Sequence, residues 1–129
     1  MNCGREEILR NCRVTLNANI RKASTGDLKA CYYVDCAFLA YLIFEQFGME
    51  PFLAEELKHQ SKTWSEEHRA VLWSLCRLQY RLLEQGSSSQ KRKGGPWLPL
   101  LKLTETGYGA ARAVMSKAGK VRNGKPNSA

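Results

Sequence analysis

The sequence predicts a mainly α-helical domain that carries one small β-hairpin. Helices are indicated by apolar residues that recur at 3.6-residue spacing in residues 5–22, 28–47 and 64–85. A hairpin is indicated by residues 97–103, whose apolar side chains alternate after the polar, glycine-containing stretch 87–96. With 129 residues, the chain is long enough to bury a single hydrophobic core.

The first two helices are expected over residues 5–22 and 28–47. On the first, the apolar stripe is Ile8, Leu9, Cys12, Leu16 and Ile20. The break between the helices contains Ser24 and Asp27, whose spacing resembles a capping device for the second helix. Gly48 is expected to end that helix, because glycine readily adopts the left-handed backbone conformation.

A short helical segment is expected next, over residues 51–59, because Pro51 suits the first turn of a helix. The long helix 64–85 follows, with Thr63 and Glu66 at capping-box spacing and Gly86 as its end. Its inward stripe is predicted to be Trp64, Val71, Leu72, Leu75, Leu78 and Leu82. Its outer face is then predicted to contain Glu66, Arg69, Ala70, Trp73, Arg77, Tyr80 and Arg81.

The last part of the chain is expected to form the hairpin and one more helix. Residues 87–96 are the loop, and they carry three consecutive cations, Lys91, Arg92 and Lys93. Thr104 is positioned to cap a final helix over residues 105–117. The chain is therefore interpreted as one domain over residues 1–117, followed by a basic tail over residues 118–129 whose composition indicates disorder.

The positive charge lies in the second part of the chain. Residues 1–84 contain equal numbers of basic and acidic side chains, so residues 85–129 supply the entire net charge of +8. A neutral body with a cationic hairpin and tail indicates a polyanionic partner. Nucleic acid and an acidic protein surface both satisfy this charge argument.

No catalytic, metal or cofactor site is predicted. The sequence lacks a nucleophile elbow and a phosphate-binding glycine loop before a helix, and its acidic residues are scattered over helix surfaces. The five cysteines contain no Cys-x-x-Cys pair, and His59 and His68 complete no zinc-ligand spacing. We therefore expect a protein that is not an enzyme, with reduced structural cysteines and with His68 packed in the core.

Three short motifs resemble winged helix-turn-helix repressors of the MarR-like type. Residues 103–107 (LTETG) resemble the junction between wing and C-terminal helix, and residues 78–84 (LQYRLLE) resemble the end of the recognition helix. Residues 52–57 (FLAEEL) resemble the first helix of the helix-turn-helix. The resemblance covers roughly residues 28–116 and implies a winged-helix fold.

The resemblance implies a DNA-binding transcriptional regulator. Helix 64–85 would enter the major groove of double-stranded DNA, while the wing 87–96 would lie on the phosphate backbone. The predicted contacts are Arg69, Trp73, Arg77, Tyr80, Arg81, Lys91, Arg92 and Lys93. The same resemblance implies a homodimer through the N- and C-terminal helices, although the first helix alternatively packs on its own domain.

Two other functions stay open at this point. The same fold is an alternative protein–protein interaction module, which the acidic start of helix 64–85 favours because Glu66 and Glu67 repel phosphate. A redox-responsive regulator would use Cys12, or Cys31 and Cys36. The longest apolar stretch, residues 37–44, is too short to span a bilayer, and no secretory signal is found, so we expect a cytoplasmic protein without a membrane segment.

Overall fold

The computed structural model describes residues 2–57, 64–91 and 97–123. It is mainly helical with one two-stranded antiparallel sheet, which confirms the predicted fold class at that level. In chain order, the elements are α1 (Asn2–Ala23), α2 (Leu28–Phe47), the 3-10 helix η1 (Ala54–Leu57), α3 (Glu66–Ser74), the π-helix η2 (Leu75–Gln79), β1 (Leu83–Lys91), β2 (Trp97–Leu103) and α4 (Glu105–Asn123).

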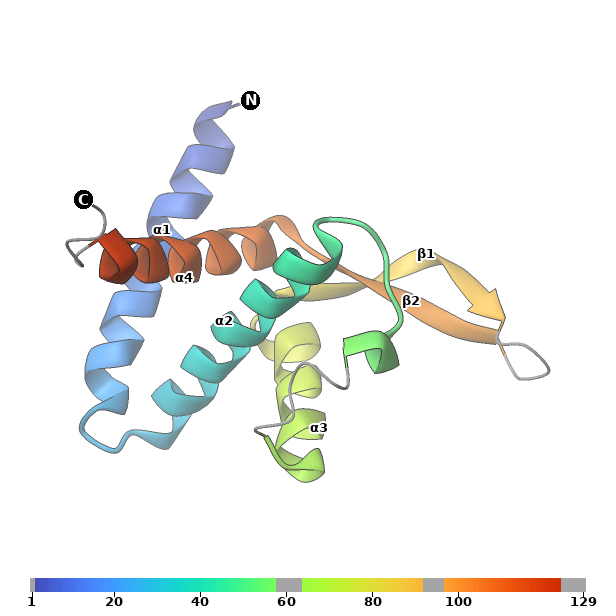
Figure 1. Cartoon of the computed structure of the whole chain (residues 1–129), viewed down its shortest axis with the longest axis horizontal. Helices are drawn as coiled ribbons and strands as arrows, with labels where there is room; N and C mark the ends of the chain where they lie inside the picture. The colour runs from blue at the N-terminus through green and yellow to red at the C-terminus, as the bar shows by residue number, and fades with distance from the viewer. Residues whose placement is uncertain (1, 58–63, 92–96, 124–129) are drawn as a thin grey trace.

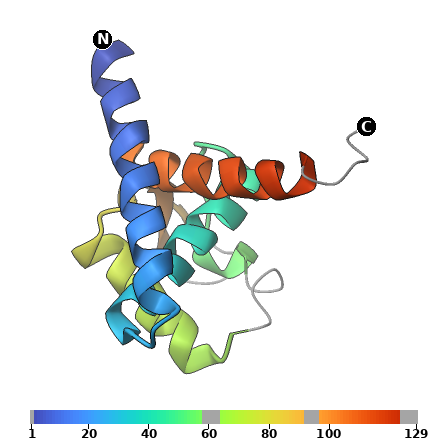
Figure 2. The ribbon, with the colours of Figure 1, turned by 90° about the vertical axis from the view of Figure 1, so that its left-hand side faces the viewer.

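Helices α1, α2 and α4 pack against one another, and α3 lies on the far side of α2 from α4 (Figure 1). Figure 2 shows α1 crossing α4 near the middle of the molecule. The predicted apolar stripe of α1 faces this crossing, where Cys12 and Leu16 are buried. The stripe therefore packs on its own domain. The sequence had left open whether it packs there or forms a dimer interface.

Both ends of helix α2 are capped by residues next to it in the chain. The Asp27 carboxylate accepts a hydrogen bond from the Ala30 backbone N–H at 3.0 Å, and Gly48 ends the helix with a φ of 66°. Gly48 thus has the predicted role. Ser24 does not cap α2, because its hydroxyl donates to the Arg21 carbonyl and so belongs to the end of α1.

The prediction of one continuous helix over residues 64–85 is wrong. Helix α3 begins after Ser65, whose hydroxyl accepts a hydrogen bond from the His68 backbone N–H, while Thr63 lies outside the described residues. The α-helical pattern stops at Ser74 and continues as the π-helix η2 to Gln79. The following residues leave the helix, and Gly86 lies inside β1 instead of ending a helix.

The hairpin pairs β1 with β2 from Leu83↔Leu103 at its base to Lys91↔Trp97 at its far end. Its register is irregular between Gln85 and Ser89. A third chain segment joins β2 as an isolated bridge, since Phe52 and Leu101 exchange two backbone hydrogen bonds of 2.8 Å. Residues 87–91 of the predicted loop 87–96 therefore belong to β1, which corrects that part of the prediction, and residues 92–96 lie outside the described residues.

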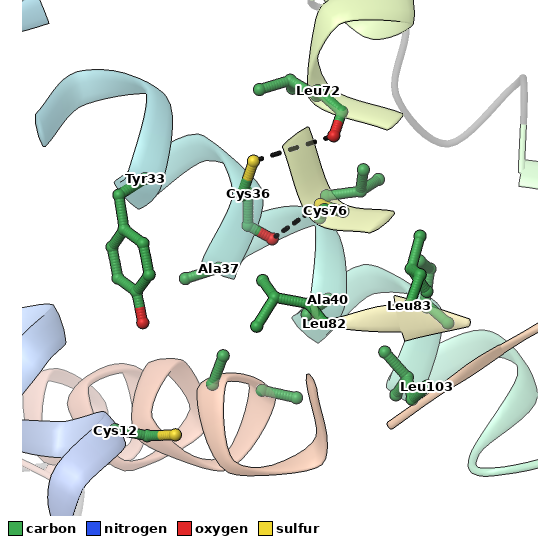
Figure 3. Packing of buried hydrophobic residues seen from close by; sticks show 14 of the residues in the cluster. Cys12, Tyr33, Cys36, Ala37, Ala40, Leu72, Cys76, Leu82, Leu83 and Leu103 are labelled. Atoms are coloured by element: carbon green, nitrogen blue, oxygen red, sulfur yellow. Dashed lines mark hydrogen bonds between the residues drawn. The ribbon is translucent and has the colours of Figure 1, made fainter. Parts of the chain in front are cut away.

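The core between α2 and η2 contains two cysteines as free thiols (Figure 3). The Cys36 thiol donates to the Leu72 carbonyl at 3.8 Å, and the Cys76 thiol donates to the Cys36 carbonyl at 4.0 Å. Cys12 is also a buried free thiol, and Cys31 is a half-buried one. These four cysteines agree with the predicted reduced and structural role.

Helix α4 is capped as predicted and extends farther than predicted. The Thr104 hydroxyl accepts a hydrogen bond from the Gly107 backbone N–H at 2.9 Å. The helix continues to Asn123, so the predicted end at residue 117 and the disorder expected from residue 118 are corrected for residues 118–123. Residues 124–129 lie outside the described residues. Among the described residues, no helix is long and apolar enough to cross a membrane.

Candidate nucleic-acid interface

The hairpin extends away from the helices, so its far end is distant from the crossing of α1 and α4 (Figure 1). Of the three loop cations, Lys91 is the last residue of β1, and its side chain is not described. Arg92 and Lys93 lie outside the described residues. The backbone therefore brings Lys91, the first of these cations, to the far end of the described hairpin, where it pairs with Trp97.

Two predicted arginines meet at the base of the hairpin. Arg77 on η2 and Arg81 just before β1 are both exposed, and they line one shallow depression of about 390 Å³. The remaining lining residues are Leu78, Leu83, Glu84, Gln85 and Thr104. Glu84 is also 3.8 Å from the Lys102 ammonium group across the hairpin, so its charge is partly compensated.

Hydrogen bonds hold the Arg81 backbone in place. Its φ of 55° is the one positive value found for a non-glycine residue in the described ranges. The Arg81 carbonyl accepts a 2.5 Å hydrogen bond from the Thr104 hydroxyl, and the next amide, of Leu82, donates to the Cys76 carbonyl at 2.6 Å. The chain is thereby turned out of η2 and into β1 with the Arg81 side chain toward solvent.

Trp73 and Tyr80 do not lie on the exposed face. The Trp73 ring packs 6.2 Å from the Phe52 ring, and the Tyr80 ring meets the Tyr33 ring edge-on at 5.0 Å. Both side chains are half-buried, and burial raises the pKa of the Tyr80 hydroxyl. Their predicted exposure is therefore corrected.

Arg69 is also displaced from the expected surface. It is half-buried, and its guanidinium donates a 3.0 Å hydrogen bond to the Trp64 carbonyl at the start of α3. This position lies at the opposite end of α3 from the hairpin base. The structure thus groups Arg77 and Arg81 with the hairpin and separates them from Arg69.

The inward face of α3 and η2 combines part of the predicted stripe with Trp73, Cys76 and Tyr80. Of that stripe, Leu72 and Leu82 are buried, and Trp64 and Leu75 pack against the core. Leu72 and Cys76 are buried, whereas Val71 is 41% exposed and Leu78 is 70% exposed. The residues that sequence reasoning placed outside, Trp73 and Tyr80, also have helical spacing to Cys76. That second stripe was the available signal, and its residues pack inward because Phe52, Cys36 and Tyr33 offer them a packing surface.

The outward face of α3 consequently changes in character along its length. Its first turn carries Glu66 and Glu67, its middle carries small side chains, and η2 carries Arg77. Acidic residues stabilise a helix N-terminus but repel phosphate. The exposed side chains in the middle are Ala70, Val71 and Ser74.

His68 is tied to α2 by an acidic partner that sequence reasoning did not identify. Its Nε2 atom lies 2.9 Å from the Asp35 carboxylate, and its ring stacks on Tyr32 at 5.3 Å. Both side chains are about one-third exposed. His68 is thus satisfied as expected, but it is half-buried at the edge of the core, so its predicted position in the core is corrected.

Among the described residues, no three His, Cys, Asp or Glu side chains are grouped so that they could hold a metal ion. No protein-family model matches the chain, and no match was found among curated proteins or solved structures. Function therefore has to be argued from the surface just described.

Proposed function

We propose that the chain is a double-stranded DNA-binding transcriptional regulator. Its binding surface consists of the outward face of α3 and η2, the base of the hairpin and the hairpin loop. The observation that carries the proposal is the position of Arg77 and Arg81, which are exposed beside the base of a hairpin whose first strand ends at Lys91. In the sequence, Arg92 and Lys93 follow Lys91 directly. Positive side chains that line one side of a neutral body suit a phosphate backbone.

The order of the elements supports a winged helix-turn-helix arrangement. In that arrangement a helix, a short strand and two further helices precede a hairpin, and the returning hairpin strand pairs with the short strand. Here α2, the Phe52 bridge, η1, α3, β1 and β2 follow one another in this order. The pairing of Phe52 with Leu101 of β2 corresponds to the short strand.

The outward face of α3 suggests how the helix would meet the DNA. The small side chains of Ala70, Val71 and Ser74 allow the helix to approach base edges closely, where methyl groups contact thymine and a hydroxyl forms hydrogen bonds. Arg77 and Arg81 would contact phosphates that flank the groove. Because Glu66 and Glu67 repel phosphate, the backbone contacts belong to the hairpin side of the helix.

A carboxylate placed in the middle of this face tests the proposal. We expect Ser74→Glu to weaken binding to duplexes selected from a random DNA pool by more than about tenfold, because the new charge faces phosphate. Ser116→Glu is the matched control, since Ser116 is an exposed helical serine beside the crossing of α1 and α4. Fluorescence anisotropy measures both, and equal losses of affinity would contradict the proposed surface.

A protein-interaction module is the second candidate, and the exposure of Leu78 favours it. Leu78 is 70% exposed beside Val71, and large apolar side chains at one surface are typical of docking sites. In this case Leu78→Asp would abolish capture of a stoichiometric protein partner that survives nuclease treatment. A variant that still captures the partner would count against this candidate.

We include in this proposal the homodimer that the resemblance implies. The apolar stripe of α1 is already used within the chain, and the large apolar residue of α1 that stays exposed is Val14, at 64%. Sedimentation of the wild type and of Val14→Glu tests the dimer. A dimer that dissociates in the variant would support it, and a monomeric wild type would remove it from the proposal.

A further inference from the structure

A pocket of about 370 Å³ lies where α1, α2, the end of η2 and the first turn of α4 meet. Its volume is within the range of small-molecule sites in proteins. The buried lining residues are Cys12, Tyr33 and Leu82, with Ile8 and Tyr80 half-buried beside them. The exposed rim is formed by Asn11, Thr15, Gln79 and Thr106, and none of these nine lining side chains carries a charge at neutral pH.

Among the buried residues that line this pocket, Tyr33 carries a hydroxyl group. Tyr33 is only 7% exposed, and within the described part of the chain its hydroxyl makes no hydrogen bond. Figure 3 shows the hydroxyl pointing from α2 toward α4 and the part of α1 that carries Cys12. Because a buried hydroxyl without a partner is costly, its orientation into a pocket indicates an acceptor that arrives from outside the protein.

The hydroxyl is suited to donate a hydrogen bond. Burial raises the pKa of Tyr33 far above its ordinary value, so the hydroxyl keeps its proton at any physiological pH. The edge-on contact with the Tyr80 ring, at 5.0 Å, restricts the Tyr33 ring on one side. A fixed, protonated donor favours a ligand with an oxygen acceptor, and the uncharged lining favours a neutral one.

The walls of the pocket are formed by tight packing between α1 and α4. The Cys12 thiol donates to the Thr106 carbonyl at 3.6 Å. A Cβ atom on Gly109 would lie 2.6 Å from the Cys12 sulfur, so α4 approaches α1 as closely as a glycine allows. The pocket is therefore preformed, and little free energy is needed to organise it around a ligand.

We propose that this pocket binds a small uncharged molecule, about the size of one substituted ring, whose carbonyl oxygen accepts a hydrogen bond from the Tyr33 hydroxyl. Ile8 and Leu82 provide apolar contact for the ring, and the neutral rim offers no counter-charge to an ionic ligand. Occupancy is measured on the protein alone, so the result does not depend on DNA binding.

The first test compares benzamide with benzoate by two-dimensional NMR of the full ¹⁵N-labelled chain. The two probes have the same shape, but benzamide is neutral and benzoate carries a negative charge. We expect benzamide to shift the backbone signals of Ile8, Thr15 and Tyr80 and to bind at least about fivefold more tightly than benzoate, because the pocket has no cation to compensate a carboxylate.

Three variants locate the binding. Tyr33→Phe removes only the hydroxyl and should weaken benzamide about fivefold, the effect of one hydrogen bond. Asn11→Trp places a large ring at the rim and should abolish the shifts. Asn17→Trp is its matched control on a different face of α1, where it should leave them unchanged.

Each result decides for or against the site. Shifts that disappear in Asn11→Trp and weaken in Tyr33→Phe would support it. The proposal would be overturned if benzamide at millimolar concentration caused no shift in the three pocket signals. It would also be overturned if benzoate bound as tightly as benzamide. Unchanged affinity in Tyr33→Phe would contradict the role of the hydroxyl, and normal thermal unfolding of that variant shows that the comparison is made on folded protein.

Discussion

Gly107 is a residue at which a single added methyl group would disturb the fold. It lies in the first turn of α4, and a Cβ atom there would overlap the carbonyl oxygen of Leu82. That carbonyl also accepts the Thr104 backbone N–H at 3.0 Å, so it has little freedom to move. The close approach explains physically why a glycine occupies this position at the junction between β2 and α4.

We expect Gly107→Ala to lower the free energy of unfolding by about 3 kcal/mol, because the overlap involves backbone atoms that cannot shift cheaply. Gly4→Ala is the matched control, since Gly4 is helical and has open space around it. There the same methyl group should raise stability by about 0.5–1 kcal/mol. Urea unfolding measures both, and a neutral Gly107→Ala would contradict the packing at this junction.

The buried thiols predict how stability depends on pH. Burial raises the pKa of Cys12, and a hydrogen bond with the Cys36 side chain, together with burial, raises that of Cys76. Because these pKa values are higher in the folded than in the unfolded chain, the stabilisation is complete below about pH 8.5 and is lost as the pH rises further. Each thiol contributes at most about 1.4 kcal/mol per pH unit.

Urea unfolding between pH 7 and pH 10 tests this dependence, with those limits chosen to bracket about pH 8.5, the ordinary thiol pKa. We expect a plateau at the neutral end and a decline at the alkaline end. The decline should be smaller in Cys12→Ala, which has one thiol fewer to ionise on unfolding. Stability that rises toward alkaline pH would contradict the burial of these groups.

At the same scale, two of the predicted caps are confirmed, whereas Ser24 and Gly86 do not act as predicted. Gly48 and Thr104 act as predicted, because a cap depends on local backbone geometry that residue type largely determines. The orientation of Trp73 and Tyr80 was not predictable from their own helix, since two apolar stripes compete there. The choice between them depends on Phe52 and Tyr33, which belong to other elements.

At the scale of elements, the junction from η2 to β1 determines where the arginines lie. A continuous helix through residue 85 would have carried Arg77 and Arg81 away from the hairpin base. Instead, the π-helix ends at Gln79 and Arg81 adopts a positive φ, which turns the chain into β1. Sequence periodicity did not reveal this junction, because the polar residues of β1 give no apolar alternation and π-helices have no simple sequence pattern.

The strained backbone of Arg81 gives a prediction with opposite signs for stability and affinity. Arg81→Gly should raise stability by about 1 kcal/mol, because glycine adopts positive φ without steric cost, and should weaken DNA binding because it removes a cation that binds phosphate. Arg77→Gly removes the same side chain from helical backbone and should lower stability by about 1 kcal/mol.

Thermal unfolding and anisotropy on the same two preparations check this prediction. Both variants should bind DNA more weakly, while their stabilities change in opposite directions. Destabilisation by Arg81→Gly would show that its side chain, rather than its backbone, matters to the junction. Unchanged DNA affinity in both variants would remove the hairpin base from the proposed surface.

On the scale of the whole molecule, charge and shape coincide. The hairpin extends from one side of the helices, and β1 ends with Lys91 (Figure 1). In the sequence, Lys91 is the first of three consecutive cations. The crossing of α1 and α4 has its own cationic depression, lined by Arg10, Arg13 and Lys117. The charge asymmetry was readable from sequence, but the separation of these two cationic regions required the fold.

The two regions allow the central claim to be tested by the salt dependence of DNA affinity. The variant that changes Lys91, Arg92 and Lys93 to glutamine removes the hairpin charges. The control changes Arg10, Arg13 and Lys117 to glutamine and removes the same total charge from the other region. Each phosphate that is no longer neutralised by a protein cation makes the slope of log affinity against log salt shallower by about 0.9.

The account predicts a slope that is shallower by about 2.7 in the hairpin variant and nearly unchanged in the control, because, of these two sets of cations, only the hairpin set binds phosphate. A slope that changes equally in both variants would mean that DNA responds only to net charge. That result would contradict the proposed surface. Affinity that does not change with salt concentration for any duplex would contradict it as well.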